Sequence, residues 1–490
     1  MGVSAGFHDA AISVIRGDGH ILFAGHSERY SKVKNDPCIH PDLLREASQW
    51  PIDTVAFYER PWMHNVQQAI SGQRCWGPWT TRGALDRYLG QSWHLMGANA
   101  QSYPHHLSHA AGGFQTSPFA EAAVVVIDAV GELDTVTIWH AHYDAQGQAQ
   151  YRRLWRQTYP HSIGLFYSAI TQAVGLKPME EEYITMGMAA YGRDFGHAWM
   201  QEYFVSDRQQ VTFRENLHAG IDRDVIPFTA NEDIAASAQA LTQDLISVVM
   251  AKASKLTGSK NLVYGGGVAL NCVANRDLTR YFDNVWIMPN PGDAGSSLGA
   301  AALALGTKIK WQTAGLGHCI PGAYPVEQLV NELYHNQIAG VASGPAEFGP
   351  RALGNRSLLA DPRGHSIKDR VNEIKRRQKF RPFAPAILEE LCPKYFDMPS
   401  GWNHSRYMQV VAHCRRPDLF PAVVHHDGSS RVQTVPRDGS GFRKLLEAWY
   451  ERTGCPMLLN TSLNIRGEPM VNDQADAVRF VALYGVRVFS

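Results

Sequence analysis

The opening of the chain alternates short apolar runs with polar turns. Apolar residues at strand spacing predict three strands, over residues 3–6, 11–15 and 20–24. A comparable apolar run over 122–128 ends in an acidic loop, and an alternating strand follows over 135–140. The pattern therefore predicts a repeated unit of strand, acidic loop and strand.

The middle of the chain carries one long helical pattern. Apolar residues recur at helical spacing over 234–256, and Thr257 and Gly258 end the run. A strand over 262–264, a glycine loop over 265–267 and a helix from Ala269 are expected next. Strands alternating with helices in this way are typical of an α/β protein.

A boundary between domains is expected over residues 312–325. This segment is rich in glycine and proline and has few periodic apolar positions. The chain has 490 residues, more than one hydrophobic core usually serves. We therefore expect two or three domains, with the main division between residues 1–315 and 325–490.

Composition narrows the class of partner. Lys and Arg total 46, as do Asp and Glu, so the net charge favours neither nucleic acid nor an anionic membrane. Neither a long apolar stretch nor a secretory leader is found, which predicts a cytoplasmic protein. The cysteines have no Cys-x-x-Cys spacing and predict reduced thiols rather than disulfides or a zinc knuckle: Cys38, Cys75, Cys272, Cys319, Cys392, Cys414 and Cys455.

Two histidines four residues apart are candidate metal ligands. On a helix, His105 and His109 would project from one face toward one ion. Asp293, which lies among glycines just before an expected helix, is the proposed third ligand. Two imidazoles and one carboxylate suit Fe²⁺, Zn²⁺ or Mn²⁺, with Fe²⁺ preferred. A histidine pair at this spacing is more often a surface or core feature, so the pair alone does not decide the matter.

Three short loops after apolar strands favour a nucleotide cleft. They contain His8 and Asp9, then Asp128, and then the glycines Gly265, Gly266 and Gly267. Backbone amides in such loops offset phosphate charge, and an acidic side chain can hold the accompanying Mg²⁺. Each glycine loop by itself could be an ordinary tight turn.

A second set of residues, nearer the C-terminus, suits anion capture. In the run 348–363, Arg351 and Arg356 flank Asn355, and guanidinium forks bind phosphate or carbamate in two-point fashion. Basic residues follow at Lys375 and Arg381, the latter just before a rigid Pro-Phe-Ala-Pro turn. A solvated helix face accounts for Arg376 and Arg377. Residues 460–469 add donors and acceptors that suit ATP, namely Asn460, Thr461, Ser462, Asn464 and Arg466.

These motifs resemble the O-carbamoyltransferases, a family that includes nodulation, cephamycin and aminoglycoside tailoring enzymes. The resemblance covers nearly the whole chain and is strongest over residues 182–192, 265–275, 348–363, 375–388 and 460–469. It implies an N-terminal actin/hexokinase-like (ASKHA) two-lobed domain, similar to the one in tRNA threonylcarbamoylation enzymes. It further implies a C-terminal α+β domain of the YrdC-like type.

The resemblance also implies a tandem reaction. The C-terminal domain would make carbamoyl adenylate from ATP and carbamoyl phosphate. The N-terminal domain would pass the carbamoyl group to a hydroxyl of a small acceptor, a natural product or a sugar. The metal would hold the adenylate phosphate, Asn271 and Gly292 would contact the nucleotide, His8 or Asp9 would act as base, and Lys34 would polarise the carbamoyl oxygen.

Several alternatives remain open at this stage. The chain could be a tRNA threonylcarbamoylation-type enzyme or a nucleotide-sensing module that uses only the N-terminal fold. Ala129 and Ala190 depart from the glycine and proline usual in relatives, so the Asp128 loop could sit differently. Oligomeric state is also open, a homodimer included. Acceptor-stacking candidates, for which buried packing is the alternative, are Trp76, Trp79, Trp93 and Trp139.

Overall fold

The computed structural model describes residues 1–70, 72 and 76–490 as two compact units of a mixed α/β protein. Unit 1 comprises Met1–Ser31 and Asn35–Thr313, and unit 2 comprises Lys32–Lys34 and Ala314–Ser490. The segment predicted to be a boundary contains strand β13 (Gly315–Ile320), which belongs to unit 2. The described cysteines are free, as predicted, and Cys75 lies outside the described residues.

Unit 1 contains two five-stranded sheets with the same topology. The first has the order β3-β2-β1-β4-β5, formed by Ile21–His26, Ala11–Ile15, Gly2–Ser4, Thr54–Phe57 and Asn99–Ser102. The second has the order β12-β11-β6-β7-β8, formed by Asn284–Trp286, Asn261–Gly265, Glu121–Gly131, Asp134–Tyr143 and Ala149–Thr158. In each sheet three consecutive strands pair antiparallel and two later strands join in parallel. The repeat predicted from the two strand and loop patterns is therefore present.

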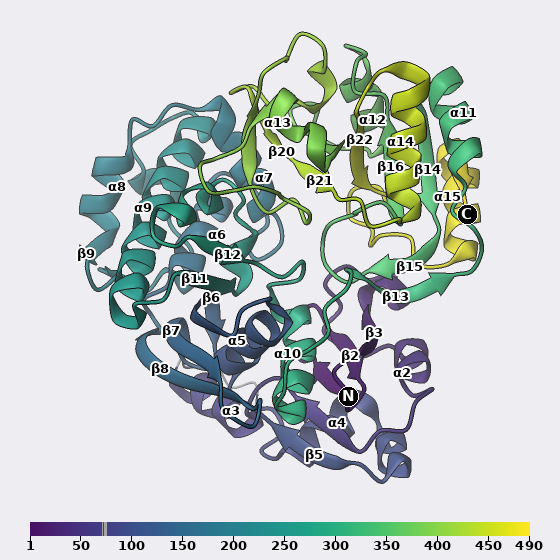
Figure 1. The fold of residues 1–490 in the computed structure, drawn as a ribbon. Coiled ribbons are helices and arrows are strands. Elements are labelled where there is room, and N and C mark those ends of the chain that lie inside the picture. Colours follow the sequence, from purple (N-terminus) through teal and green to yellow (C-terminus); the bar gives the residue numbers. More distant parts are fainter. Residues whose placement is uncertain (71, 73–75) are drawn as a thin grey trace. The chain divides into compact units, whose positions relative to one another are not determined.

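Helices cover these sheets (Figure 1). The main ones are α2 (Pro41–Ala47), α3 (Pro61–Ile70), α4 (Thr81–Leu89), α5 (His105–Thr116), α6 (Ile163–Ala173), α7 (Glu182–Met188), α8 (His197–Phe204), α9 (Asn231–Thr257) and α10 (Asp293–Leu305). Helix α9 is long and apolar enough to cross a membrane, yet 61% of its most apolar window is buried, as in a core helix. It ends at Gly258, which adopts the left-handed conformation that glycine favours.

One predicted helix is wrong. Instead of a helix from Ala269, the chain forms two short 3₁₀ segments, Gly267–Leu270 and Ala274–Arg280. Asn271 lies between them, and its side-chain oxygen accepts a hydrogen bond from the Ala274 amide at 3.1 Å. This local bond competes with a continuous helix.

Unit 2 is built on a six-stranded mixed sheet. Its order is β21-β17-β22-β16-β14-β23, formed by Gln433–Val435, Ala384–Leu388, Met457–Ser462, Arg356–Ala360, Ile338–Ala342 and Val488–Phe489. Strand β13 pairs with β15 (Gly344–Glu347), and β18 (Phe396–Asp397), β19 (Val411–Cys414) and β20 (Ser429–Arg431) form a small sheet. The principal helices are α11 (Val326–Asn336), α12 (Ile367–Ile374), α14 (Gly441–Thr453) and α15 (Gln474–Tyr484).

Candidate metal centre and anion site

Close packing of helix α10 brings the first constellation together. A methyl group at Gly299 would lie 1.8 Å from the carbonyl oxygen of Ser108 on α5, and one at Gly2 would lie 1.9 Å from that of Ser297 on α10. Glycine therefore lets α10 approach both α5 and the first sheet. Figure 1 shows α5 and α10 side by side in unit 1.

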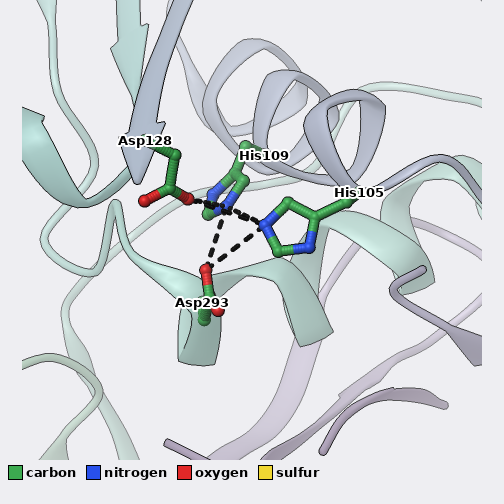
Figure 2. A group of neighbouring side chains, drawn as sticks. All are labelled: His105, His109, Asp128 and Asp293. Atoms are coloured by element: carbon green, nitrogen blue, oxygen red, sulfur yellow. Dashed lines mark hydrogen bonds and ion pairs between the residues drawn. The ribbon is translucent and has the colours of Figure 1, made fainter. Parts of the chain in front are cut away.

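Four side chains converge where these elements meet (Figure 2). His105 and His109 come from α5, Asp293 begins α10, and Asp128 lies near the end of β6. One nitrogen or oxygen of each lies within 4.8 Å of those of the others, and their side chains are 1–13% exposed. The predicted ligands therefore meet, and Asp128, predicted as a nucleotide contact, joins them.

The spacing of the four atoms suits a cation. His109 Nε2 lies 3.0 Å from His105 Nε2, 3.0 Å from Asp128 Oδ2 and 3.2 Å from Asp293 Oδ1. An ion with metal–ligand bonds of about 2.1 Å places neighbouring ligand atoms about 3.0–3.4 Å apart. Only one proton can lie between the two facing nitrogens, whereas a cation satisfies both lone pairs. The donor set fits a transition-metal ion.

The pKa shifts of these side chains also indicate that the cluster suits a cation. Burial lowers the pKa of His105, but Asp293 and Asp128 outweigh burial and hold that pKa well above its usual value. Burial raises the pKa of Asp128, but the two imidazoles outweigh it and hold that pKa well below its usual value. The two carboxylates thus require positive charge beside them, carried either by protons on the histidines or by a metal cation.

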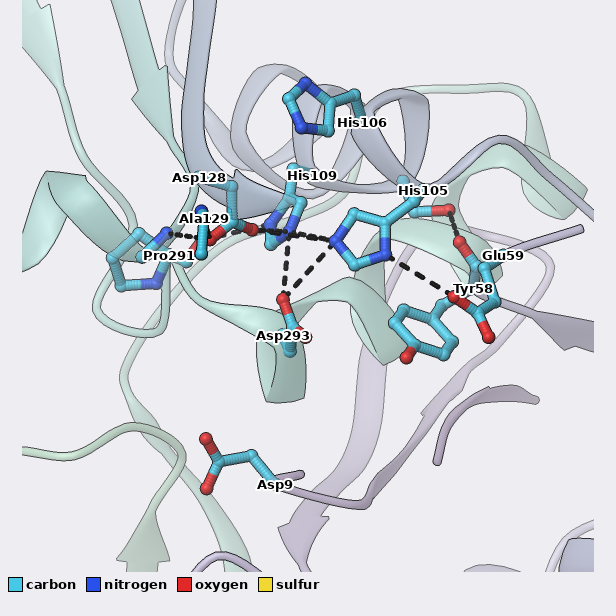
Figure 3. Close-up of polar contacts among 12 residues, drawn as sticks. Asp9, Tyr58, Glu59, His105, His106, His109, Asp128, Ala129, Pro291 and Asp293 are labelled. Carbon is cyan, nitrogen blue, oxygen red and sulfur yellow. Dashed lines mark hydrogen bonds and ion pairs between the residues drawn. The ribbon is translucent and has the colours of Figure 1, made fainter. Parts of the chain in front are cut away.

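Neighbouring groups orient the four side chains (Figure 3). His109 Nδ1 lies 3.1 Å from the carbonyl oxygen of Pro291, and His105 Nδ1 lies 3.8 Å from Glu59 Oε2. The Ala129 amide donates to Asp128 Oδ1 at 2.8 Å, so the alanine that replaces the usual glycine still holds this loop. Glu59 was missed from the sequence, although it follows an apolar run in the strand-then-acid pattern seen elsewhere.

His8 and Asp9 lie at the edge of this cluster. His8 Nδ1 is 2.9 Å from Asp9 Oδ2, and His8 Nε2 is 3.7 Å from Asp293 Oδ2. Burial lowers the pKa of His8, but Asp293 and Asp9 outweigh burial and raise it to about 9. Asp9 has a φ of 54°, in the left-handed region that non-glycine residues rarely adopt. The first loop is therefore held in an uncommon conformation beside the cluster.

The glycine loop packs onto the same site. Gly266 has a φ of 87°, and a methyl group there would lie 2.2 Å from the Ile127 carbonyl oxygen, so only glycine fits. The Gly267 amide donates to Asp128 Oδ1 at 3.3 Å, Gly265 ends β11, and Gly292 has open space where a side chain would be. Asn271, predicted to contact the nucleotide, exchanges two 3.1 Å hydrogen bonds with Gln239 on α9 through its side-chain amide.

The second constellation centres on buried Lys375 in unit 2. Its ammonium donates to oxygens of Ser462 and Asn464 at 2.5–3.2 Å, and all four of these oxygens are uncharged. Burial lowers its pKa well below the usual value, and Arg377, Arg381 and Lys34 lower it further. This region therefore carries more positive than negative charge and suits an anion.

Lys34, predicted to polarise the carbamoyl oxygen, belongs to unit 2, whereas His8 and Asp9 belong to unit 1. Lys32 pairs with Asp476 of α15, and Asp476 also accepts a hydrogen bond from the Asn472 amide at 2.9 Å. A segment near the N-terminus thus contributes a cation beside Lys375, and the role of Lys34 in polarising the carbamoyl oxygen stays a prediction.

Arg356 also departs from the prediction. It is fully buried, and its guanidinium donates to the carbonyl oxygens of His318, Ser343, Gly344, Asn355 and Asn472 at 2.9–3.2 Å. Because its guanidinium donates to these backbone oxygens, Arg356 links segments of unit 2 and is not placed to bind the predicted anion. Arg351 is half-buried and stays a candidate.

Of the remaining residues predicted to bind ATP or the anion, some pack inside unit 2 and others lie at its surface. Asn355 donates to the Pro345 carbonyl oxygen at 2.7 Å, and buried Asn460 donates to Ala352 O at 3.0 Å and Gln433 Oε1 at 2.7 Å. Thr461 is half-buried at the end of β22, and Arg466 is exposed, with its amide bonded to Lys375 O at 2.9 Å. Ser462 and Asn464 thus lie directly at Lys375, and the Asn355 and Asn460 amides support the surrounding loops.

Glu347 is a functional neighbour that sequence analysis missed. Its Oε1 accepts hydrogen bonds from the amides of Leu353, Asn355 and Arg356 at 2.8–3.2 Å. A buried carboxylate thereby fixes the backbone of the arginine-bearing loop. Its sequence signal is only one glutamate at the end of a strand, which no local pattern distinguishes from an exposed residue.

The chain resembles known proteins in sequence. The model of the carbamoyltransferase C-terminus matches residues 330–489, and that of the carbamoyltransferase N-terminus matches residues 82–302. Nodulation protein U of Rhizobium tropici is 30% identical over 96% of this chain and 92% of its own length. Nodulation protein NolNO of Sinorhizobium fredii is 31% identical over 96% of this chain and 76% of its own length.

Solved structures resemble the chain only weakly. The activator of the 2-hydroxyisocaproyl-CoA dehydratase from Clostridium difficile, with bound ADPNP, has 13% identity and a TM-score of 0.36, covering 62% of this chain and 93% of that one. Component A of the Acidaminococcus fermentans (R)-2-hydroxyglutaryl-CoA dehydratase has 14% identity and the same TM-score. Likeness at this level carries no argument about fold or function.

Proposed function

Because the chain belongs to the carbamoyltransferase family, we propose that it forms carbamoyl adenylate from ATP and carbamoyl phosphate and transfers the carbamoyl group to a hydroxyl of a small acceptor. Unit 1 is proposed to be actin/hexokinase-like, supported by its two sheets of identical topology. Unit 2 is proposed to be YrdC-like and to form the adenylate.

The first step is assigned to the Lys375 region. Carbamoyl phosphate and water give carbamate and phosphate; a carbamate oxygen then attacks the α-phosphorus of ATP, and pyrophosphate leaves. Both substrates are polyanions, accompanied by Mg²⁺. Lys375, Arg381 and Lys34 supply positive charge where these anions must lie close together.

The second step is assigned to unit 1. The acceptor oxygen attacks the carbamoyl carbon, the bond to the phosphate oxygen of AMP breaks, and the hydroxyl proton passes to a base. His8 and Asp9 lie at the edge of the acidic cluster and are the candidates for that base. His105, His109, Asp128 and Asp293 would hold Fe²⁺, Zn²⁺ or Mn²⁺, which supplies Lewis-acid stabilisation of phosphate charge.

One observation carries this proposal: the two units present opposite electrostatic requirements. Unit 1 has a buried acidic cluster that needs a cation, and unit 2 has a buried basic cluster that needs an anion. A reaction that joins an anion-consuming step to a metal-dependent transfer uses both.

The test is pyrophosphate release by the purified protein. We expect release from ATP only when carbamoyl phosphate is added, with AMP accumulating as the adenylate hydrolyses or is transferred. Release that is independent of carbamoyl phosphate, or no release under any metal condition, would contradict the proposal.

A further inference from the structure

The imidazole of His105 is contacted at two opposite edges by segments that are far apart in the sequence. Gly131, which ends β6, lies against the Cδ2 edge, since a methyl group at Gly131 would be 2.3 Å from His105 Cδ2. Glu59 lies at the other edge, where its Oε2 is 3.8 Å from His105 Nδ1. Only a residue without a side chain fits at Gly131. The orientation of this imidazole therefore depends on where the two segments lie.

The segment that contains Glu59 is itself fixed against α5. The Tyr58 ring contacts the His105 ring with centroids 5.1 Å apart, and the Tyr58 carbonyl oxygen accepts a hydrogen bond from Ser108 Oγ at 2.8 Å. Figure 3 shows Tyr58 and Glu59 beside His105. Because Tyr58 directly follows β4, these contacts tie the end of a strand to the helix that carries both imidazoles of the cluster.

One ion pair joins the two segments. Glu132 follows Gly131 and is only 5% exposed, and Arg60 follows Glu59. The amide and the guanidinium of Arg60 donate four hydrogen bonds to the two carboxylate oxygens of Glu132, at 2.5–3.1 Å. Two-point pairing of this kind fixes the relative orientation of both side chains. The pair therefore connects the turn after β6 to the segment after β4, 72 residues away in the chain.

The backbone of Glu132 indicates that folding alone does not explain this residue. Glu132 is the first residue of a two-residue turn between β6 and β7, and its φ is 57°. Such a turn favours glycine where φ is positive. A buried ion pair is, moreover, often no more stabilising than apolar residues of the same size. A carboxylate that is both strained and buried therefore indicates a requirement that glycine would not meet.

We propose that Arg60 and Glu132 are positioning residues whose ion pair holds the His105 imidazole in the orientation that a cation in the acidic cluster requires. This inference rests on the metal site of the proposed function. Neither residue is one of the four ligands. Each acts through the backbone that it fixes, Arg60 through Glu59 and Glu132 through Gly131. Without the pair, both edges of the imidazole lose their fixed neighbours.

Titration of the metal-free, full-length chain with Co²⁺ tests this inference. Co²⁺ is a transition-metal ion that suits imidazole and carboxylate ligands, and its visible absorption band depends on their number and arrangement. Loss of a group that orients a metal-binding histidine typically weakens binding roughly 10- to 100-fold. We therefore expect Glu132→Gln and Arg60→Gln each to weaken Co²⁺ binding by roughly this factor and to alter the band of the bound ion.

Comparison of the two variants separates positioning from a general effect of charge. They remove opposite charges, so a long-range electrostatic effect would weaken Co²⁺ binding in Glu132→Gln and strengthen it in Arg60→Gln. Loss of positioning weakens binding in both. Arg153→Gln is the matched control, because Arg153 pairs with Asp134 of the same hairpin at 3.3 Å. Its affinity for Co²⁺ should stay within about twofold of the wild type, as expected for loss of an exposed ion pair.

Four outcomes would overturn the inference: no Co²⁺ binding by the wild type, unchanged affinity and absorption in both variants, opposite changes in the two variants, or an equally large loss in Arg153→Gln. Thermal melting without metal shows whether each variant folds. Arg60 is 35% exposed, so Arg60→Gln decides the question if Glu132→Gln does not fold. Co²⁺ binding needs neither ATP nor carbamoyl phosphate, so a lack of pyrophosphate release would refute the proposed function and leave this test in force.

Discussion

The acidic cluster of unit 1 and the Lys375 region of unit 2 have opposite electrostatic requirements and are built from different residue types. In unit 1, two carboxylates and two imidazoles face one point, and their pKa shifts show that positive charge is required there. In unit 2, a buried ammonium rests on uncharged oxygens while neighbouring cations lower its pKa. The first cluster therefore suits a cation and the second suits an anion. A substitution in one cluster should leave the reaction step assigned to the other unchanged.

We expect the strongest loss of activity from a substitution in the unit 1 cluster. His109→Ala removes one of four ligands, and carbamoyl transfer should fall more than about 100-fold, beyond the cost of losing an outer-shell partner. Metal content, measured by plasma mass spectrometry, should fall with it, while pyrophosphate release persists. His106→Gln is the control, because His106 lies on the same helix but bonds to Thr137 at 2.9 Å. Equal loss of both steps in His109→Ala would mean that the division of labour is wrong.

The next prediction is that Arg356 stabilises the fold, whereas Arg351 in the same motif serves the reaction. Arg356→Met leaves at least five backbone carbonyl oxygens without their donor. Each buried acceptor that loses its donor costs roughly 1–3 kcal/mol. Thermal or urea unfolding should show unit 2 strongly destabilised.

Arg351→Met provides the contrast, because Arg351 is only half-buried. It should keep the unfolding transition near that of the wild type and lower the rate of pyrophosphate release. An Arg356→Met protein of normal stability and impaired ATP turnover would return Arg356 to the anion site.

A smaller effect on activity is expected at Lys375. Lys375→Met should slow carbamoyl-phosphate-dependent pyrophosphate release about 100-fold, as for loss of one strong electrostatic contact in a catalytic site. Metal content should be unchanged, since the cluster in unit 1 is intact. Lys379→Met is the matched control: Lys379 is 68% exposed and pairs with Glu373 at 3.5 Å. Unchanged release in Lys375→Met would remove the basic cluster from the first step.

The smallest effect is expected at the ion pair between Glu390 and Arg443 in unit 2, whose charges balance each other without a ligand. Hydrogen bonds from Arg443 lower the pKa of Glu390 to about 2. Because this pKa is depressed, the pair stabilises the fold above about pH 4.5 and loses that stabilisation as pH falls toward 2. Glu390 is partly exposed, so the gain is only about 1 kcal/mol.

Glu390→Gln should therefore lower stability at pH 6, and its difference from the wild type should shrink as pH falls. Unfolding midpoints measured from pH 6 to pH 3 check this, with the exposed Glu451→Gln as control. A difference that grows in acid would contradict the assignment.

Local patterns were sufficient for much of the fold. The strand predicted over 11–15 coincides with β2, and the helix predicted over 234–256 lies within α9, because both depend on side-chain periodicity and on the glycine that ends the helix. The His105 and His109 pair was also accessible, since a spacing of four residues fixes a shared helix face. The helix expected from Ala269 failed, because the Asn271 side chain accepts a hydrogen bond from the Ala274 amide and also bonds to Gln239, which is distant in the chain.

Local sequence patterns were enough to predict the repeated strand units, the long core helix and the residue types that could act as ligands. Four features emerged only on folding: Asp128 joins the histidines, Glu59 lies near His105, Lys34 groups with the unit that contains Lys375, and Arg356 bonds to backbone carbonyl oxygens. The reason is physical: periodicity and capping act over a few residues, whereas burial and charge pairing depend on segments that meet only when the chain has folded.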